Sequence, residues 1–243
     1  MTTKIHLIAP ALLLVSASAF ADPGYYLVGV YENEGQATLD YRYWTVKFPR
    51  APEVVWPEIG FGYGVTKRWY TELYASYVGS SGTATRLSTL NWQNDYLLTQ
   101  GQYDFDLALH TNLINNHGRA RGKVLEFGPA LQTEVGRMQL NANLVFERAF
   151  ATVASTPTLL KYQWQVKYRW KPEFQFGLQG FGELGAWDQW APRARQSHRA
   201  GPMVYGTLPV GASDSVAYQA ALLKGSIYGQ SGYMFSMQLR YLF

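Results

Sequence analysis

The clearest pattern in the chain is an alternation of apolar and polar residues. It runs in the order Leu160, Lys161, Tyr162, Gln163, Trp164, Gln165, Val166, Lys167, Tyr168, Arg169 and Trp170. A period of two places successive side chains on opposite faces of a β-strand. This stretch therefore predicts a strand with one apolar and one polar face.

The same two-faced pattern recurs at residues 126–135, 139–147, 173–179 and 233–243. Several of these runs approach the ~9–11 residues of a membrane strand, whereas soluble strands are typically ~5–6 residues long. In lipid every backbone polar group must be paired, so a spanning sheet has to close on itself. We therefore predict an all-β fold, a closed antiparallel transmembrane β-barrel. A soluble exported β-domain is the alternative.

Twelve strands can be placed on the chain, an even number as bacterial single-chain barrels require. The predicted ranges are 36–48, 54–65, 69–78, 84–97, 103–114, 123–135, 138–149, 158–170, 174–186, 198–208, 214–224 and 233–243. Short and long connections alternate between them, as periplasmic turns and outer loops do. Both termini of the predicted barrel then lie on the periplasmic side. Aromatic residues that suit a membrane interface fall near these connections, namely Trp69, Trp170, Phe174, Tyr241, Trp187 and Trp190.

The first residues have the features of a cleaved signal peptide. Lys4 supplies positive charge, residues 7–15 are apolar, and Ala19-Phe20-Ala21 is a small-x-small cleavage pattern. We expect residues 1–21 to be removed and residues 36–243 to form the barrel. Residues 22–35 are expected to lie either in the periplasm or inside the lumen, because a thirteenth strand would give an odd count. After Ala21 no apolar run reaches the ~18 residues of a transmembrane helix.

Composition narrows the possible functions. Only 16% of the residues are charged and 16% are aromatic, whereas a soluble domain averages about 25% charged residues and disordered chains lack aromatics. With no cysteine, the chain can form no disulfide, thiolate metal site or lipoprotein anchor. The formal net charge of +4 is too small to indicate a nucleic-acid partner. We expect no cofactor.

The polar faces of the predicted strands carry twelve charged residues that we expect to line the lumen. They are Glu58, Glu72, Asp104, Asp106, Glu126, Glu134, Glu147, Lys161, Lys167, Arg169, Glu183 and Arg240. Two interpretations stay open: a ladder of ion pairs that braces the wall, or a water-filled pore whose charges select solutes. Neither sign dominates strongly enough to predict anion or cation selectivity.

The spacing of the histidines does not indicate a catalytic site or a metal site. His110 shares a strand face with Ala108 and Asn112, with no serine beside it, while Ser197 and His198 face opposite ways in a strand. No His-x-His or His-Glu-x-x-His motif occurs. We therefore predict a protein that is not an enzyme, although cross-strand pairing could build a dyad that the sequence does not reveal.

Two resemblances add to this interpretation. The stretch Tyr233-Met-Phe-Ser-Met-Gln-Leu-Arg-Tyr-Leu-Phe243 resembles the C-terminal strand signal of outer-membrane barrels, with Tyr241 and Phe243 as its aromatic positions. Three further stretches resemble the outer-membrane family labelled as the MetA pathway of phenol degradation. They are Leu125-Glu-Phe-Gly-Pro129 with the turn Gly136-Arg137, Tyr168-Arg-Trp-Lys-Pro-Glu173 leading into Gly177-Leu-Gln-Gly-Phe-Gly-Glu183, and Arg199-Ala-Gly-Pro202.

The first resemblance implies recognition by the barrel-assembly machinery, and the second implies a channel-like or transport-associated barrel. Together with the strand pattern, they lead us to expect an outer-membrane channel that passes small solutes through a narrow polar lumen. Its other partners would be outer-membrane lipids. The alternatives are an outer-membrane enzyme that modifies lipids, such as a lipid hydrolase, and a purely structural or interaction barrel.

Overall fold

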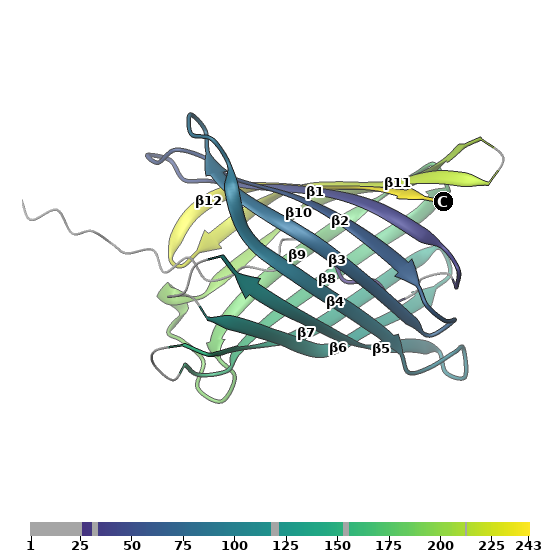
Figure 1. Cartoon of the computed structure of the whole chain (residues 1–243), viewed down its shortest axis with the longest axis horizontal. Helices are drawn as coiled ribbons and strands as arrows, with labels where there is room; N and C mark the ends of the chain where they lie inside the picture. The colour runs from purple at the N-terminus through teal and green to yellow at the C-terminus, as the bar shows by residue number, and fades with distance from the viewer. Residues whose placement is uncertain (1–25, 31–33, 118–121, 153–155, 212) are drawn as a thin grey trace, which may run out of the picture.

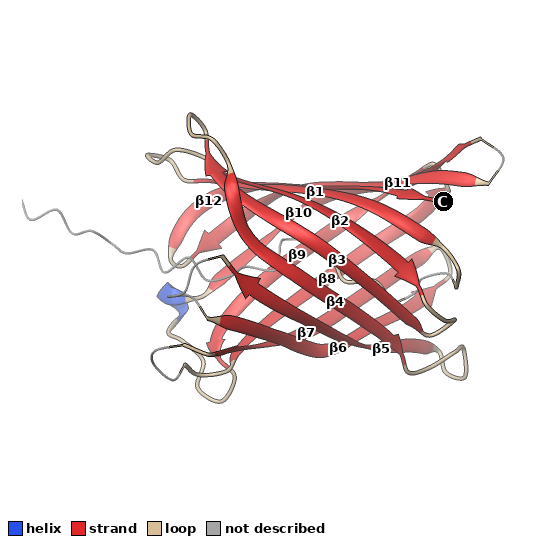
Figure 2. Cartoon of the chain, viewed as in Figure 1, coloured by secondary structure: helices blue, strands red, loops and turns tan. Residues whose placement is uncertain are grey.

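The structure is a computed structural model that describes residues 26–30, 34–117, 122–152, 156–211 and 213–243. The expected signal peptide, residues 1–21, lies outside the described residues. Twelve strands follow one another along the chain (Figures 1 and 2). They are β1 (Ala37–Lys47), β2 (Val54–Gly64), β3 (Trp69–Ser80), β4 (Arg86–Leu97), β5 (Phe105–Asn116), β6 (Lys123–Val135), β7 (Met138–Phe150), β8 (Leu159–Lys171), β9 (Phe174–Ala186), β10 (Ser197–Val210), β11 (Asp214–Ile227) and β12 (Gln230–Leu242).

Each strand pairs antiparallel with its neighbours in sequence, and β1 pairs with β12 to close the barrel. Asp40 lies opposite Arg240 in this closing pair, and the amide of Phe243 donates to the Ala37 carbonyl oxygen at 3.0 Å. The predicted twelve-stranded closed barrel is confirmed. A 3₁₀ turn at Arg193–Arg195 lies in the β9–β10 loop. Within the described residues, no helix is long and apolar enough to cross a bilayer.

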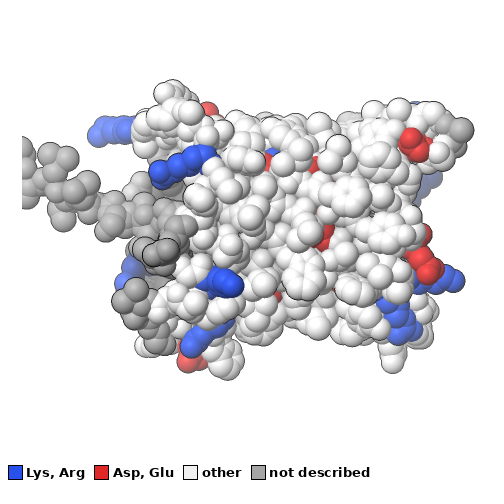
Figure 3. Space-filling view, viewed as in Figure 1, with Lys and Arg blue, Asp and Glu red and all other residues white. Residues whose placement is uncertain are grey.

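The two faces of the strands have opposite chemistry. Outward side chains such as Phe61, Leu73 and Leu222 are exposed, which suits contact with lipid. Most inward side chains are polar and buried, including Gln93 and Asn112. The space-filling view in Figure 3 shows a largely uncharged middle, with Lys, Arg, Asp and Glu gathered toward the two ends. This distribution matches an apolar belt between two polar interfaces.

Two connections differ from the predicted alternation of short turns and long loops. We expected an eight-residue outer loop at residues 225–232, but only Tyr228 and Gly229 separate β11 from β12. Both have positive φ, 49° and 82°, as a tight two-residue hairpin requires. On the opposite end, residues 98–104 connect β4 to β5 and form a longer turn than predicted, because β5 begins only at Phe105.

The inward face is not uniformly polar, contrary to the expected pattern. An apolar cluster lies inside the barrel, built from Trp44, Val46, Phe181, Met203, Ala221, Leu223, Ile227 and Met234. The Trp44 ring stacks on Trp56 with 4.6 Å between centroids. Small barrels are partly filled by their own side chains, so apolar residues can occupy inward positions where they pack on one another rather than face water.

Candidate functional site

The lumen contains a short stretch of the chain that precedes β1. We call residues 26–30 the lumen segment. The hydroxyl of Tyr26 lies 3.1 Å from that of Tyr74 on β3 and 3.2 Å from Gln93 Oε1 on β4. The Val28 amide donates to Gln163 Oε1 on β8 at 3.1 Å, and Asn143 Nδ2 on β7 donates to the Val28 carbonyl oxygen at 3.0 Å. The lumen segment is therefore held by two separate parts of the wall.

Apolar contacts and burial complete the seating of the lumen segment. Val28 and Val30 are buried in a cluster with Leu97, Ala108 and Ala130 from β4, β5 and β6. The Tyr26 side chain is buried as well. The sequence left two positions open for residues 22–35, and residues 26–30 lie inside the barrel.

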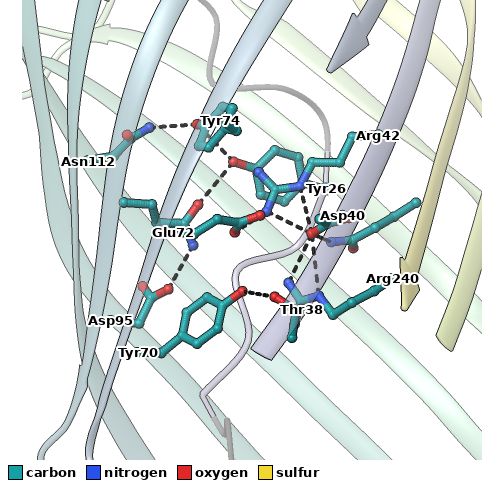
Figure 4. A network of polar contacts seen from close by, with 12 residues as sticks. Tyr26, Thr38, Asp40, Arg42, Tyr70, Glu72, Tyr74, Asp95, Asn112 and Arg240 are labelled. Carbon is teal, nitrogen blue, oxygen red and sulfur yellow. Dashed lines mark hydrogen bonds and ion pairs between the residues drawn. The ribbon is translucent and has the colours of Figure 1, made fainter. Parts of the chain in front are cut away.

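Arg42 on β1 is the centre of a charged network against the lumen segment (Figure 4). Its Nη2 lies 3.0 Å from Asp40 Oδ2 and 2.6 Å from Glu72 Oε2 on β3. All three side chains are buried. The guanidinium carbon also lies 3.8 Å from the ring centroid of Tyr26 and 4.7 Å from that of Tyr74, within the range of a cation–π contact. Arg42 thus joins β1, β3 and the lumen segment.

Asp40 extends this network across the closing strand pair. Gln238 Nε2 on β12 donates to Asp40 Oδ2 at 2.7 Å, and Arg240 Nη2 lies 3.2 Å from the same oxygen. Two cations and two carboxylates therefore lie together. This pairing fits the rule that buried charges persist only when compensated.

Glycines on β2 make room for the network. A Cβ on Gly62 would lie 2.0 Å from the Tyr70 hydroxyl, which forms a 2.8 Å hydrogen bond with Thr38. A Cβ on Gly60 would lie 2.7 Å from Glu72 Oε1. The inward face of β2 therefore accepts side chains from its neighbours instead of projecting its own.

A second cluster joins β6, β7 and β8. Glu126 lies directly opposite Glu147 in the β6–β7 pairing, a placement that like charges disfavour. Lys161 on β8 offsets this repulsion, since its Nζ lies 3.4 Å from Glu126 Oε1 and 2.5 Å from Glu147 Oε2. Asn112 Nδ2 donates to Glu126 Oε2 at 3.2 Å and to the Tyr74 hydroxyl at 2.9 Å. The two clusters are thus connected through amide and phenol groups.

A cavity of about 330 Å³ remains beside the lumen segment. On one side it is lined by Leu27, Gly29 and Val30. The wall side carries mainly amides and two cations, and includes Gln132, Gln139, Asn141, Gln165, Lys167, Tyr205, Gln219, Gln238 and Arg240. The interior is therefore narrowed by the lumen segment but not filled by it.

The structure brings together most of the twelve charged residues expected in the lumen. Glu72 and Arg240 join the Arg42 network, and Glu126, Glu147 and Lys161 form the second cluster. The other placements are Glu58 with Ser76, Glu183 with Arg199, Glu134 with Arg169, Asp106 with Thr99, and Lys167 against Tyr205. Asp104 stands apart, because it is exposed in the turn before β5. That these side chains line a conducting passage stays a prediction.

Sequence reasoning missed Asp40, Arg42 and Tyr26, which carry the main network. The alternation through β1 could have identified Asp40 and Arg42 as inward-facing, since they share a strand face with Thr38. That face continues into Trp44 and Val46, so it did not stand out as polar. No sequence pattern placed Tyr26 in the lumen, because its position depends on where the chain enters the barrel.

The histidines have partners that the sequence did not reveal. His110 Nδ1 lies 2.6 Å from Asp95 Oδ1 on β4. His198 Nδ1 lies 2.8 Å from the Tyr162 hydroxyl, and its Nε2 lies 2.8 Å from Gln196 Oε1. Neither imidazole has a serine hydroxyl among its hydrogen-bond partners in the described part of the chain. The described residues likewise contain no group of three or more His, Asp or Glu side chains placed to hold a metal ion.

Comparison with known proteins identifies the architecture. No family model matches the chain, and no curated protein matches it. The COG4313 outer membrane channel from Pseudomonas putida F1 is similar in structure, with a TM-score of 0.62 at 13% identity over 91% of this chain and 98% of that one. The NanC porin has a TM-score of 0.57 at 9% identity over 83% of this chain and 98% of that one. The expected likeness to outer-membrane barrels is thus confirmed at the level of the fold, and the chain has the twelve-stranded architecture of these barrels.

Proposed function

We propose that this protein is a channel of the bacterial outer membrane that passes small solutes. The observation that carries the proposal is a closed barrel with an apolar outer belt whose interior keeps a polar cavity of about 330 Å³ beside the lumen segment. Twelve strands lie between the filled eight-stranded barrels and the open 16–18-stranded porins. A narrow passage for small solutes fits this size.

The lumen segment sets the width of this passage. It is held by hydrogen bonds to β3, β4, β7 and β8 rather than by a covalent link, so it narrows the lumen in its seated position. The ion pairs around Arg42 and Lys161 brace the surrounding wall. The two interpretations of the lumen charges, a structural ladder and a solute path, then apply to different parts of the same interior.

Export and assembly follow from the two ends of the chain. We propose that residues 1–21 direct secretion and are then removed. We also propose that Tyr241 on the last strand and Phe243 directly after it are recognised by the barrel-assembly machinery, with the finished barrel embedded in outer-membrane lipid. In support, the rings of Tyr241 and Phe243 pack with 4.8 Å between centroids, and the Phe243 side chain is exposed.

The channel is favoured over the lipid-hydrolase alternative by the position of the histidines. His110 lies on the buried inward face with Asp95, and the hydrogen bonds of His198 go to a phenol and an amide. A hydrolytic dyad needs a nucleophile within hydrogen-bond reach of its base. Neither arrangement supplies one.

Planar-bilayer recording tests the proposed function. The refolded chain from residue 22 onward should give small, discrete conductance steps. A variant that lacks residues 22–30 should give larger steps, because the barrel wall is intact and the lumen segment is gone. If neither protein conducts, the channel proposal is wrong and a structural barrel is the better account.

A further inference from the structure

We infer that the cavity beside the lumen segment is a binding site for small organic carboxylates, with Lys167 as its anion-binding residue and the Tyr205 ring and Leu27 against the apolar body of the ligand. This inference rests on the proposed function in one respect: it supplies a solute class for the same passage.

Lys167 is unusual among the inward cations. The side chains of Arg42, Lys161, Arg199 and Arg240 each lie within ion-pairing distance of a carboxylate. Lys167 is only 7% exposed, and no carboxylate of a described residue lies within 4.0 Å of its Nζ. Its contact is the face of the Tyr205 ring, 4.0 Å from the centroid. A buried ammonium without a counter-ion is costly, so an anion in contact with it gains more than it would in water.

Glu134 lies in line with Lys167 across the β6–β7–β8 pairing, but it is already paired with another cation. Glu134 binds Arg169 through two hydrogen bonds, with Arg169 Nη1 at 2.8 Å from Oε1 and Nη2 at 2.5 Å from Oε2. That bidentate pair lies two positions along β8 from Lys167, where both partners are partly exposed. The charge of Lys167 is therefore available to an anion bound in the cavity.

The cavity lining suits an anion in a second way. Among the described residues that line it there is no Asp or Glu, whereas Arg240 and several side-chain amides do line it. Side-chain amides of Gln139, Gln165 and Gln219 can each donate hydrogen bonds to carboxylate oxygens. Four carboxylates of the lumen, Asp40, Glu72, Glu126 and Glu147, instead lie in the Arg42 and Lys161 clusters, where cations compensate them.

The lining also favours an organic anion over an inorganic one. Leu27, Val30 and Ala217 add apolar surface to the cavity, as does the Tyr205 ring. A volume of about 330 Å³ is at the lower end of small-molecule pockets, about 300–1,000 Å³, and is far larger than a bare ion needs. A carboxylate with a small apolar body can place its charge at Lys167 and its body against these side chains.

Isothermal titration of the refolded, detergent-solubilised protein tests this inference, with benzoate as the probe and benzamide as its uncharged isostere. Wild type should bind benzoate at least tenfold more tightly than benzamide. Lys167→Gln should reduce that preference to twofold or less, and Lys167→Arg should restore it. Lys171→Gln is the matched control, since it also removes one cation from β8 but lies outside the cavity lining, so it should keep the preference.

The outcomes separate this inference from the channel proposal. If Lys167→Gln keeps the preference for benzoate, or if wild type has none, the carboxylate site is wrong even when the protein conducts ions. If inorganic phosphate binds as tightly as benzoate, the organic-carboxylate assignment is wrong. If benzoate binds as expected but no variant conducts in bilayers, the site stands and the channel proposal falls.

Discussion

Tyr26→Ala is the most informative single change, because it removes the side chain that fixes the lumen segment to the Arg42 network. The tyrosine loses two hydroxyl contacts, to Tyr74 and Gln93, each worth about 1 kcal/mol. It also loses the Arg42 contact at 3.8 Å, about 2 kcal/mol for a desolvated cation–π pair. Burial of an aromatic ring adds about 2 kcal/mol.

These contributions belong to one side chain and do not add fully. Taking about half of their total gives about 3 kcal/mol, which corresponds to roughly a hundredfold change in the equilibrium between seated and released lumen segment. The contacts of Val28 with Gln163 and Asn143 are untouched by the substitution. We therefore expect the segment to be released part of the time rather than permanently.

Single-channel recording in planar bilayers measures this release. Tyr26→Ala should show frequent transitions to a larger conductance that wild type reaches about a hundredfold less often. Tyr103→Ala is the matched control, because Tyr103 is an exposed tyrosine in the β4–β5 turn, and it should behave as wild type does. If Tyr26→Ala has the open-state frequency of wild type while remaining folded, the lumen segment does not limit the passage and this reasoning is refuted.

The remaining predictions concern stability, assembly and export. Arg42→Met should lower the free energy of unfolding in liposomes, measured by urea titration, by about 3–5 kcal/mol, since it removes the cation between buried Asp40 and Glu72 and leaves Arg240 as the remaining cation of the network. Arg169→Met breaks an exposed pair and should cost at most about 1 kcal/mol; equal losses would contradict the role given to burial. Phe243→Ala should reduce the amount of folded protein in the outer membrane of cells without changing refolding in vitro, whereas Phe174→Ala should leave both unchanged. N-terminal sequencing of the exported protein should begin at Asp22, and retention of residues 1–21 would show that the leader is not cleaved.

The barrel could be predicted from the sequence because lipid imposes a rule on every spanning residue. Each strand must present apolar groups outward, so regular alternation such as that through β8 and β12 identified strands, and the alternating lengths of the connections gave their number and order. Such a rule does not apply to the connections. The hairpin at Tyr228 and Gly229 is tight because both residues adopt positive φ. Tyrosine rarely adopts positive φ, so its presence in the sequence did not predict this turn.

The interior was less predictable because contacts there cross between strands. The charged residues of the lumen could be assigned to the inward face, but their partners depend on register and on side-chain reach. Asp95 pairs with His110 across β4 and β5, and Lys161 reaches over β7 to Glu126. Apolar inward residues such as Trp44 also broke the expected polar face, since packing inside the barrel satisfies them as well as lipid does.

The pairing of β1 with β12 has a consequence for the order of biogenesis. These strands lie at opposite ends of the barrel sequence, so Asp40 and Arg240 meet only after nearly the whole polypeptide has been delivered. Contacts between such distant residues form slowly. The lumen segment is held by side chains of β3, β4, β7 and β8, so the wall that receives it is complete only once this last seam has formed. The narrow lumen is therefore a late product of assembly, because both its closed wall and the seat of the lumen segment depend on strands from the two halves of the chain.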